Sequence, residues 1–219
     1  MAILFRKSLD ESRIPDEWRL SNVTPVFKKR SKAEPGNYRP VSLTSNICKL
    51  MEKVINDTLG VYIDQNVLNN TQHGFRKGRS CQTNLIEFFD KVGGWLDESQ
   101  NVDVLYLDFA KAFDKVDHER MMVKLAAAGV EGKLRAWLKD WLSKRYQRVV
   151  VEGEASGWLL VESGMPQGTV LAGPLFTVFV KDMDEVVKAF LRKFADDTKL
   201  ARLILSPLDM ESFQADKTA

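Results

Sequence analysis

The chain has 219 residues, which is enough for one large domain or two small ones. Hydrophobic residues make up 44% and charged residues 28%, a balance that is typical of a globular protein with a core and excludes general disorder. The net charge of +2 is nearly neutral, so total charge does not indicate a nucleic-acid-binding protein. Basic residues nevertheless gather in three segments, each of which alone is typical of a solvated surface: residues 28–30, 76–79 and 139–148.

Cysteine and histidine usage excludes two further classes of protein. Cys48 and Cys81 form no CxxC pair and no disulfide framework, so we expect reduced thiols in an intracellular protein, nuclear or cytoplasmic. His73 and His118 are isolated, which argues against a zinc site. The first apolar stretch is too short for a signal peptide, and no apolar run approaches the roughly 20 residues that span a bilayer. We therefore expect a soluble protein without a membrane partner.

The N-terminal half reads as alternating helices and extended segments. From the N-terminus, the patterns predict a short helix, a β-rich segment, a polar loop and two amphipathic helices: residues 2–10, 22–27, 28–37, 47–63 and 81–96. Pro25 lacks an N–H group and indicates that the β-rich segment is an edge strand. The following apolar run, residues 102–109, has the length of a central strand. Its alternation places Asp108 on the face opposite Leu105 and Leu107, so the acid should look into an open cleft.

The C-terminal half is predicted to contain helices, two hairpins and a tail. Two helices, one hairpin turn and one longer helix are expected at residues 118–128, 133–144, 153–157 and 174–190. Short β-prone stretches at residues 187–194 and 198–204 then flank a second hairpin. The tail from residue 206 to residue 219 is polar and without clear periodicity, so we expect it to be irregular.

The tip of the second hairpin carries the most informative motif, Phe194-Ala195-Asp196-Asp197. Two adjacent carboxylates resist joint ionisation unless a cation lies between them. Asp108 lies at the end of a predicted strand, and together these three acids could hold a two-metal site for phosphoryl transfer. Each piece also has a plain structural reading. The hairpin acids could form an exposed turn, and Asp108 could end a strand or cap a helix.

Five motifs in order connect these acids to a known family. They are NYRPVSL, QHGFRKGRSC, DFAKAFD, GMPQGTVL and FADD, which begin at residues 37, 72, 108, 164 and 194. The series resembles the reverse transcriptases of non-LTR (LINE-type) retrotransposons over residues 4–203. The resemblance implies an α+β fold, with the fingers and the ferredoxin-like palm of a right-hand polymerase. By this resemblance we expect fingers over residues 1–101 and palm over residues 102–205, with residues 119–163 partly contributing to the fingers. By the same resemblance we expect an incomplete domain, truncated after FADD and without the thumb.

The resemblance also implies roles for the acids. Asp108 and Asp196 resemble the two principal metal ligands of the family, and Asp197 is the adjacent, supporting acid. Carboxylate oxygens suit Mg²⁺, with Mn²⁺ as a substitute. Two such ions would serve an RNA-directed DNA polymerase that adds deoxynucleoside triphosphates to a DNA primer on an RNA template.

Five further residues are expected, by resemblance, at the incoming nucleotide. Arg76, Lys77 and Arg79 would line the fingers against the triphosphate, and their sequence does not distinguish which of them makes the contact. Phe113 would exclude a 2′-hydroxyl group from the sugar site, although an ordinary core phenylalanine fits the sequence nearly as well. Gln167 would lie beside the nascent base pair, although its tripeptide also fits a simple turn.

Template and primer contacts are expected from Arg39, Gly164, Pro166 and Gly168. Asp114 is expected to make a structural hydrogen bond or salt bridge rather than to bind metal. The alternative function is a catalytically inactive remnant that binds nucleic acid or a partner. A different two-metal nuclease or a nucleotidyl cyclase would fit the acids but not the flanking motifs.

Overall fold

The structure is a computed structural model that describes residues 1–216. It divides into two compact units, and each unit combines residues from two separate parts of the chain. Unit 1 comprises residues 1–61 and 113–172, and unit 2 comprises residues 62–112 and the described residues from 173 onward. The expected division into fingers (residues 1–101) and palm (residues 102–205) stays a prediction, since these units are defined by their internal packing and not by function. The α+β class is confirmed, since both units combine helices with a separate sheet.

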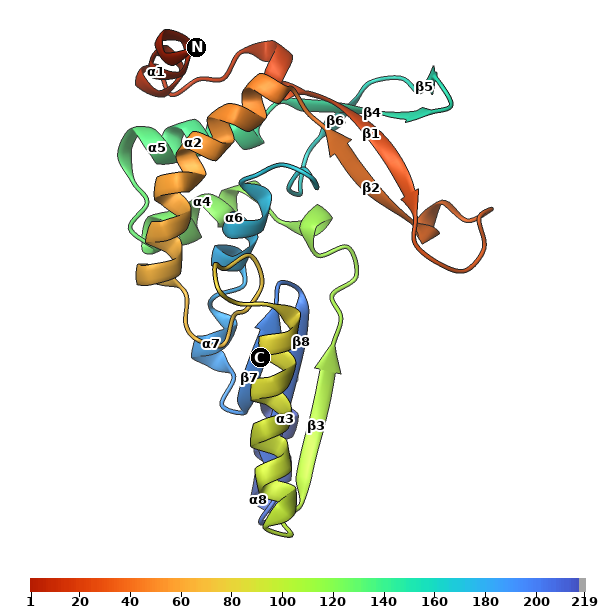
Figure 1. Cartoon of the computed structure of the whole chain (residues 1–219), viewed down its shortest axis with the longest axis vertical. Coiled ribbons are helices and arrows are strands. Elements are labelled where there is room, and N and C mark those ends of the chain that lie inside the picture. Colours follow the sequence, from red (N-terminus) through yellow and green to blue (C-terminus); the bar gives the residue numbers. More distant parts are fainter. Residues whose placement is uncertain (217–219) are drawn as a thin grey trace. The chain divides into compact units, whose positions relative to one another are not determined.

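Unit 1 holds a sheet packed with helices (Figure 1). Its strands are β1 (Leu20–Phe27), β2 (Tyr38–Leu43), β4 (Arg145–Val151), β5 (Glu154–Ala155) and β6 (Leu159–Val161). Their order is β2-β1-β4-β5, and β6 also pairs with β4. Its helices are α1 (Ala2–Asp10), α2 (Asn46–Tyr62), α4 (His118–Ala127) and α5 (Gly132–Leu142), with short 3₁₀ turns at Asp16–Arg19, Pro35–Asn37 and Phe113–Lys115. The expected helices and the hairpin near Gly153 are therefore confirmed in this unit.

Tryptophan side chains join the helices of unit 1. Trp137 and Trp141 on α5 are completely buried. The indole N–H of Trp137 donates a hydrogen bond to the hydroxyl of Ser8 on α1, at 2.9 Å. Large buried aromatic surfaces with a paired N–H contribute strongly to a core, so α5 is the helix that anchors this unit.

The expectation that Pro25 marks an edge strand is wrong. β1 lies inside the sheet, between β2 on one side and β4 on the other. The parallel register with β4, however, ends at the pair Val23↔Val149, whereas the antiparallel register with β2 continues through Pro25↔Pro40. Pro25 therefore lies in the half of β1 that has only one partner strand, where its missing N–H group breaks no ladder.

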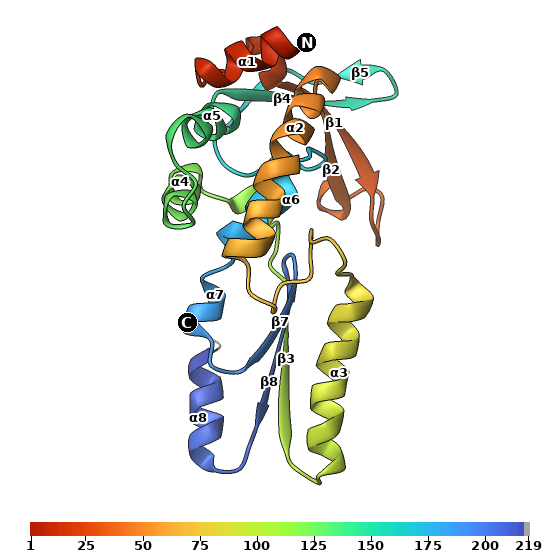
Figure 2. The same cartoon turned by 60° about the vertical axis from the view of Figure 1, so that its left-hand side comes forward.

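Unit 2 is built on a three-stranded antiparallel sheet of order β3-β8-β7 (Figure 2). Its strands are β3 (Val102–Leu107), β7 (Phe190–Phe194) and β8 (Asp197–Leu203). Its helices are α3 (Cys81–Asp97), α6 (Ala172–Phe179), α7 (Met183–Val186) and α8 (Pro207–Asp216), with one turn of π-helix at Ile63–Val67. The single helix expected over residues 174–190 is in fact two helices, α6 and α7, which are separated at residues 180–182.

Helices α3 and α8 cover opposite faces of this sheet (Figure 2). Ala201 packs with Phe88 and Val92 of α3, whereas the neighbouring Leu200 packs with Phe213 of α8. This is the period of two that a strand imposes on its side chains. Both faces of the sheet are covered, and the loop end of the β7–β8 hairpin lies next to the end of β3 in the strand register.

The expectation of an irregular tail at residues 206–219 is wrong for residues 207–216. Residues 207–216 form α8, and Asp209 in its first turn accepts hydrogen bonds from the preceding backbone N–H groups of Leu205 and Ser206. At the other end, the carboxylate of Asp216 accepts backbone N–H groups of Lys188 and Ala189, both at 3.0 Å. Long-range contacts therefore hold this helix, and residues 217–219 lie outside the described part of the chain.

Candidate active site

The acids Asp196 and Asp197 lie at a tight hairpin turn that we call the aspartate turn (residues 194–197). Phe194 and Asp197 are the last paired residues of β7 and β8, so Ala195 and Asp196 form a two-residue loop. Ala195 has φ of +56°, as the turns that suit two-residue hairpins require at their first position. The turn therefore fixes the backbone that carries both acids, and the predicted hairpin is confirmed.

Asp108 comes from a distant part of the chain to the same end of the sheet. The antiparallel register of β3 with β8 ends at the pair Leu107↔Thr198. Asp108 follows Leu107 and Asp197 precedes Thr198, so the two acids occupy the next position along the same two strands. A pocket at this end is lined by Tyr106, Leu107, Asp108, Asp197, Thr198 and Lys199. The pocket thus brings together two of the three predicted acids.

The chemistry of this pocket suits a hard divalent cation. Asp108 and Asp197 are exposed, and Asp196 is half-buried in the turn beside them. Within residues 1–216, no group of three acidic, histidine or cysteine side chains is placed to hold a metal ion. Mg²⁺ commonly takes only one or two protein carboxylates and completes its shell with water and substrate phosphates. Two carboxylates in an open pocket meet that requirement, so the donor set fits.

Lys199 is a member of the pocket that the sequence did not single out. Its ammonium group donates a hydrogen bond to the side-chain oxygen of Asn84 on α3. Burial lowers the pKa of Lys199, and the negative charge of Asp197 opposes this shift. A lysine beside two carboxylates reduces their mutual repulsion. Lys199 lies two residues after Asp197, so both side chains point to the same face of β8. The sequence contains this spacing, but only the strand register shows that this face lines the pocket.

The three basic side chains of residues 76–79 differ in whether other groups of the chain already pair with their charges. Arg76 pairs with the carboxylate of Asp64 and also donates to the backbone carbonyls of Asp64, Asn69 and Gln72. Its side chain is only 9% exposed. Because each of these contacts lies inside unit 2, Arg76 closes the loop between residues 64 and 72.

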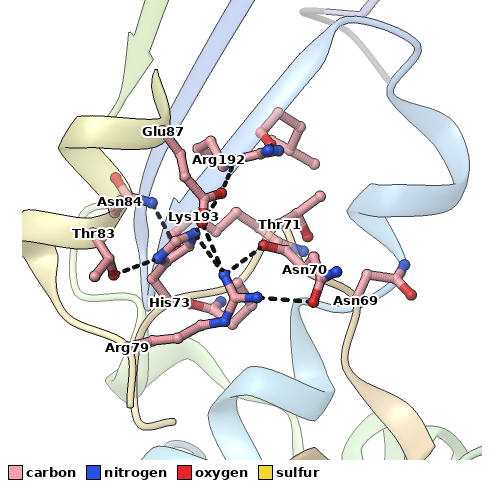
Figure 3. A network of polar contacts seen from close by, with 12 residues as sticks. Asn69, Asn70, Thr71, His73, Arg79, Thr83, Asn84, Glu87, Arg192 and Lys193 are labelled. Carbon is pink, nitrogen blue, oxygen red and sulfur yellow. Dashed lines mark hydrogen bonds and ion pairs between the residues drawn. The ribbon is translucent and has the colours of Figure 1, made fainter. Parts of the chain in front are cut away.

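Arg79 is similarly engaged (Figure 3). Its guanidinium donates to the backbone and side-chain oxygens of Asn70, at 3.2 and 2.8 Å, and contacts His73 and Glu87. Lys77 is exposed, and no hydrogen bond or ion pair within the described chain involves it. Lys77 is therefore the member of the trio whose charge is available to a ligand.

His73 lies at the centre of the polar network in Figure 3. Its ring is fully buried, with Nδ1 2.9 Å from the hydroxyl of Thr83 and Nε2 3.3 Å from the carboxylate of Glu87. Burial lowers the pKa of His73, the charges of Arg79 and Arg192 lower it further, and Glu87 opposes them. Glu87 also pairs with Arg192 on β7, at 2.9 Å. The network therefore ties the basic segment to α3 and to β7.

In unit 1, the GMPQG loop contacts the end of the DFAKAFD motif. The backbone N–H of Met165 donates to the carbonyl of Phe113, and the side-chain amide of Gln167 donates to the carboxylate of Asp114 at 3.2 Å. Gly164 has φ of +89°, and a Cβ there would lie 2.8 Å from the Cα of Asp114. The structural hydrogen bond expected of Asp114 is confirmed. Phe113 itself is half-buried at the start of a 3₁₀ turn.

The same loop also contacts the NYRPVSL strand. The carbonyl of Gln167 accepts the backbone N–H of Ser42 at 2.7 Å, and a Cβ on Gly168 would lie 3.3 Å from the carbonyl of Ser42. Pro166 precedes these contacts, and its carbonyl accepts the hydroxyl of Thr169. Arg39 is exposed on β2, opposite Val26 in the register. Three motifs that are far apart in the sequence are thus neighbours in unit 1.

Comparison with known proteins supports the family resemblance that the five motifs indicate. The profile of the family "Reverse transcriptase (RNA-dependent DNA polymerase)" matches residues 27–203. The chain belongs to the reverse transcriptase family. No helix in the described part of this reverse transcriptase chain is long and apolar enough to cross a bilayer.

Mobile-element proteins are among the relatives of this reverse transcriptase chain. The "Probable RNA-directed DNA polymerase from transposon BS" of Drosophila melanogaster is 29% identical over 213 residues, which cover 91% of the chain. The "RNA-directed DNA polymerase from mobile element jockey" of the same organism is 26% identical over 208 residues, which cover 90% of the chain. The chain spans 23% of the length of each relative. The expected kinship with reverse transcriptases of non-LTR retrotransposons is confirmed.

A solved structure shares the fold. The apo telomerase of Candida tropicalis, truncated from its C-terminal domain, matches 94% of this chain with a TM-score of 0.63 and 10% identity. The match covers 47% of the telomerase chain. At this identity the likeness concerns the fold alone, and it agrees with the expected polymerase architecture.

Proposed function

We propose that the chain carries the polymerase centre of an RNA-directed DNA polymerase, which adds deoxynucleotides to a DNA primer paired with an RNA template. The observation that carries this proposal is the pocket in which Asp108 and Asp197 meet beside the turn that holds Asp196. Membership of the reverse transcriptase family supports the class of reaction. We propose fingers over residues 1–101 and palm over residues 102–205, with residues 119–163 partly contributing to the fingers.

Asp108 and Asp197, which line the pocket, and Asp196 in the adjoining turn are the residues that would hold two Mg²⁺ ions, or Mn²⁺ ions in their place. Each ion would take only one or two of these carboxylates and complete its shell with water and substrate phosphates. When bound, such ions activate the attacking primer hydroxyl and stabilise the charge of the leaving pyrophosphate. The carboxylates supply the negative charge that attracts the cations, and Lys199 keeps that charge partly balanced before they bind. Because phosphoryl transfer depends mainly on positioning and charge neutralisation, the rigid strand register is itself part of the mechanism.

For the incoming nucleotide, we assign the triphosphate contact to Lys77, since Arg76 and Arg79 are engaged in holding its segment. In unit 1, Phe113 is the filter against a 2′-hydroxyl group and Gln167 the neighbour of the nascent base pair. The hydrogen bond from Gln167 to Asp114 supports this assignment because it orients the amide.

Template and primer contacts fall to the rest of the same loop and to the adjacent strand. Gly164, Pro166 and Gly168 supply a close-packed backbone, and Arg39 supplies an exposed charge on β2. Such a cation can contact a phosphate oxygen without reading sequence.

Primer extension tests the proposal. Separate Asp108→Asn and Asp196→Asn variants, assayed on an RNA template with a DNA primer and Mg²⁺, should lower the extension rate by at least about a hundredfold. Asp90→Asn, which removes an exposed acid on α3, should retain the wild-type rate. Wild-type extension by Asp196→Asn would contradict the site. A wild-type chain that binds template and primer in a salt-dependent manner but never extends would instead be a binding remnant.

A further inference from the structure

The buried side chain of Gln72 contacts the aspartate turn directly. Gln72 is 1% exposed. Its Oε1 accepts the backbone N–H of Ala195 at 2.9 Å and that of Gly74 at 2.7 Å. Its Nε2 is also buried and makes no hydrogen bond within residues 1–216. The oxygen alone therefore makes the hydrogen bonds of this side chain.

The backbone around Gln72 is fixed to β7. Lys193 donates its N–H to the carbonyl of Thr71, and His73 donates its N–H to the carbonyl of Lys193, both at 2.8 Å. This pairing forms a parallel bridge between Gln72 and Lys193, one residue before the turn begins. A Cβ on Gly74 would lie only 2.4 Å from the backbone nitrogen of Ala195, so only glycine permits this approach.

A buried ion pair holds the same bridge from the other side. The Lys193 ammonium lies 3.0 Å from the Asp184 carboxylate, and both side chains are almost completely buried. The same carboxylate accepts the hydroxyl of Thr71 at 2.7 Å and the side-chain amide of Asn69. Asn84 of α3 donates to the carbonyl of Lys193 at 3.1 Å. Gln72 is thus held in place by contacts on both sides of the bridge.

We propose that Gln72 is a positioning residue of the polymerase centre, whose amide oxygen fixes the aspartate turn and so the direction of Asp196 and Asp197. The inference rests on the proposed function. Ala195 adopts a positive φ that costs energy for an alanine, so the turn needs a partner to maintain it. A neutral acceptor supplies that partner without adding a third negative charge beside the two acids.

Three matched variants of the full 219-residue chain test the role of Gln72. Gln72→Met removes the oxygen at similar volume. Gln72→Glu keeps an oxygen and loses no hydrogen bond, since Nε2 makes none within the described residues. Gln100→Met removes another amide whose oxygen is buried, before β3 at the opposite end of the sheet. The readouts are hydrogen exchange of the Ala195 amide without metal, and Mn²⁺ binding measured by electron paramagnetic resonance.

Gln72→Met should accelerate exchange at Ala195 and weaken Mn²⁺ binding, each about tenfold, the factor that one lost hydrogen bond produces. Gln72→Glu should restore protection at Ala195, and Gln100→Met should match the wild type in both measurements. Unchanged exchange or Mn²⁺ binding in Gln72→Met, or equal loss of protection in Gln72→Glu, would overturn the inference. If the wild-type chain bound Mn²⁺ no more tightly than the Asp196→Asn variant, the proposed function would be contradicted instead. Exchange at Ala195 would still report on the role of Gln72.

Discussion

The indole N–H of Trp141 donates a hydrogen bond to the carboxylate of Glu52, at 3.1 Å, in the core of unit 1. Glu52 is completely buried and also accepts the thiol of Cys48 and the backbone N–H groups of Val170 and Leu171. Burial, and then the charge of Glu52, raises the pKa of Cys48 to about 12. One carboxylate therefore joins α2, α5 and the loop that follows Gln167.

Replacing Glu52 by glutamine tests this junction. An amide group of the same shape would turn an N–H group toward one of the donors, so Glu52→Gln should lower the free energy of unfolding by about 3 kcal/mol. Glu119→Gln removes an exposed ion pair with Lys139 and should cost less than about 1 kcal/mol. Urea denaturation followed by tryptophan fluorescence measures both. Equal losses in the two variants would contradict the role of Glu52.

The buried His73 should make stability depend on pH. Its pKa is lowered from 6.5 in the folded state, so the unfolded chain takes up a proton first as the pH falls. The free energy of unfolding should therefore decrease as the pH falls from 6.5 toward the folded-state pKa. Urea titrations between pH 7.5 and 5 should show this decline in the wild type and in His118→Gln. The decline should be smaller in His73→Gln. If the free energy of unfolding fell equally with pH in all three chains, His73 would not be its cause.

Truncating Lys77 should change KM for the nucleotide, whereas truncating Arg76 should change the free energy of unfolding. Lys77→Ala removes an exposed charge and should raise KM for deoxynucleotide by roughly tenfold while stability stays unchanged. Arg76→Ala leaves Asp64 and three carbonyls without their donor, so it should lower the free energy of unfolding by about 2 kcal/mol. Steady-state primer extension and urea denaturation separate the two effects. If neither Lys77→Ala nor Arg76→Ala raised KM, residues 76–79 would not belong to the nucleotide site.

Phe113 should control sugar selection if it lies under the incoming nucleotide. Phe113→Val shortens the side chain, so the ratio of kcat/KM for ribonucleotide over deoxynucleotide should rise by at least about tenfold. Phe89→Val, which alters an exposed phenylalanine on α3, should leave the ratio unchanged. Single-nucleotide incorporation measures both ratios. An unchanged ratio in Phe113→Val would leave Phe113 as a packing residue.

Local patterns predicted most elements because their causes are local. The helix expected at residues 81–96 occurs as Cys81–Asp97, since Ser80 and Thr83 form a capping box at its start. The failures have distant causes. α8 has no clear apolar stripe, and it is held by the burial of Phe213 against the sheet and by the contacts of Asp216 with Lys188 and Ala189. Neither contact leaves a signal within residues 206–219.

The sequence alone determined the family and indicated the three candidate acids, because ordered motifs and a strand followed by a charged hairpin are properties of the linear chain. Only the tertiary structure decided which of these residues lie together. The register of β3 with β8 brings Asp108 beside Asp197, and the bridge with β7 brings Gln72 to Ala195. It also separates Lys77, which is exposed, from Arg76 and Arg79, whose charges are used inside unit 2. Hydrogen-bond partners far apart in the chain set these relations, and composition and periodicity do not encode them.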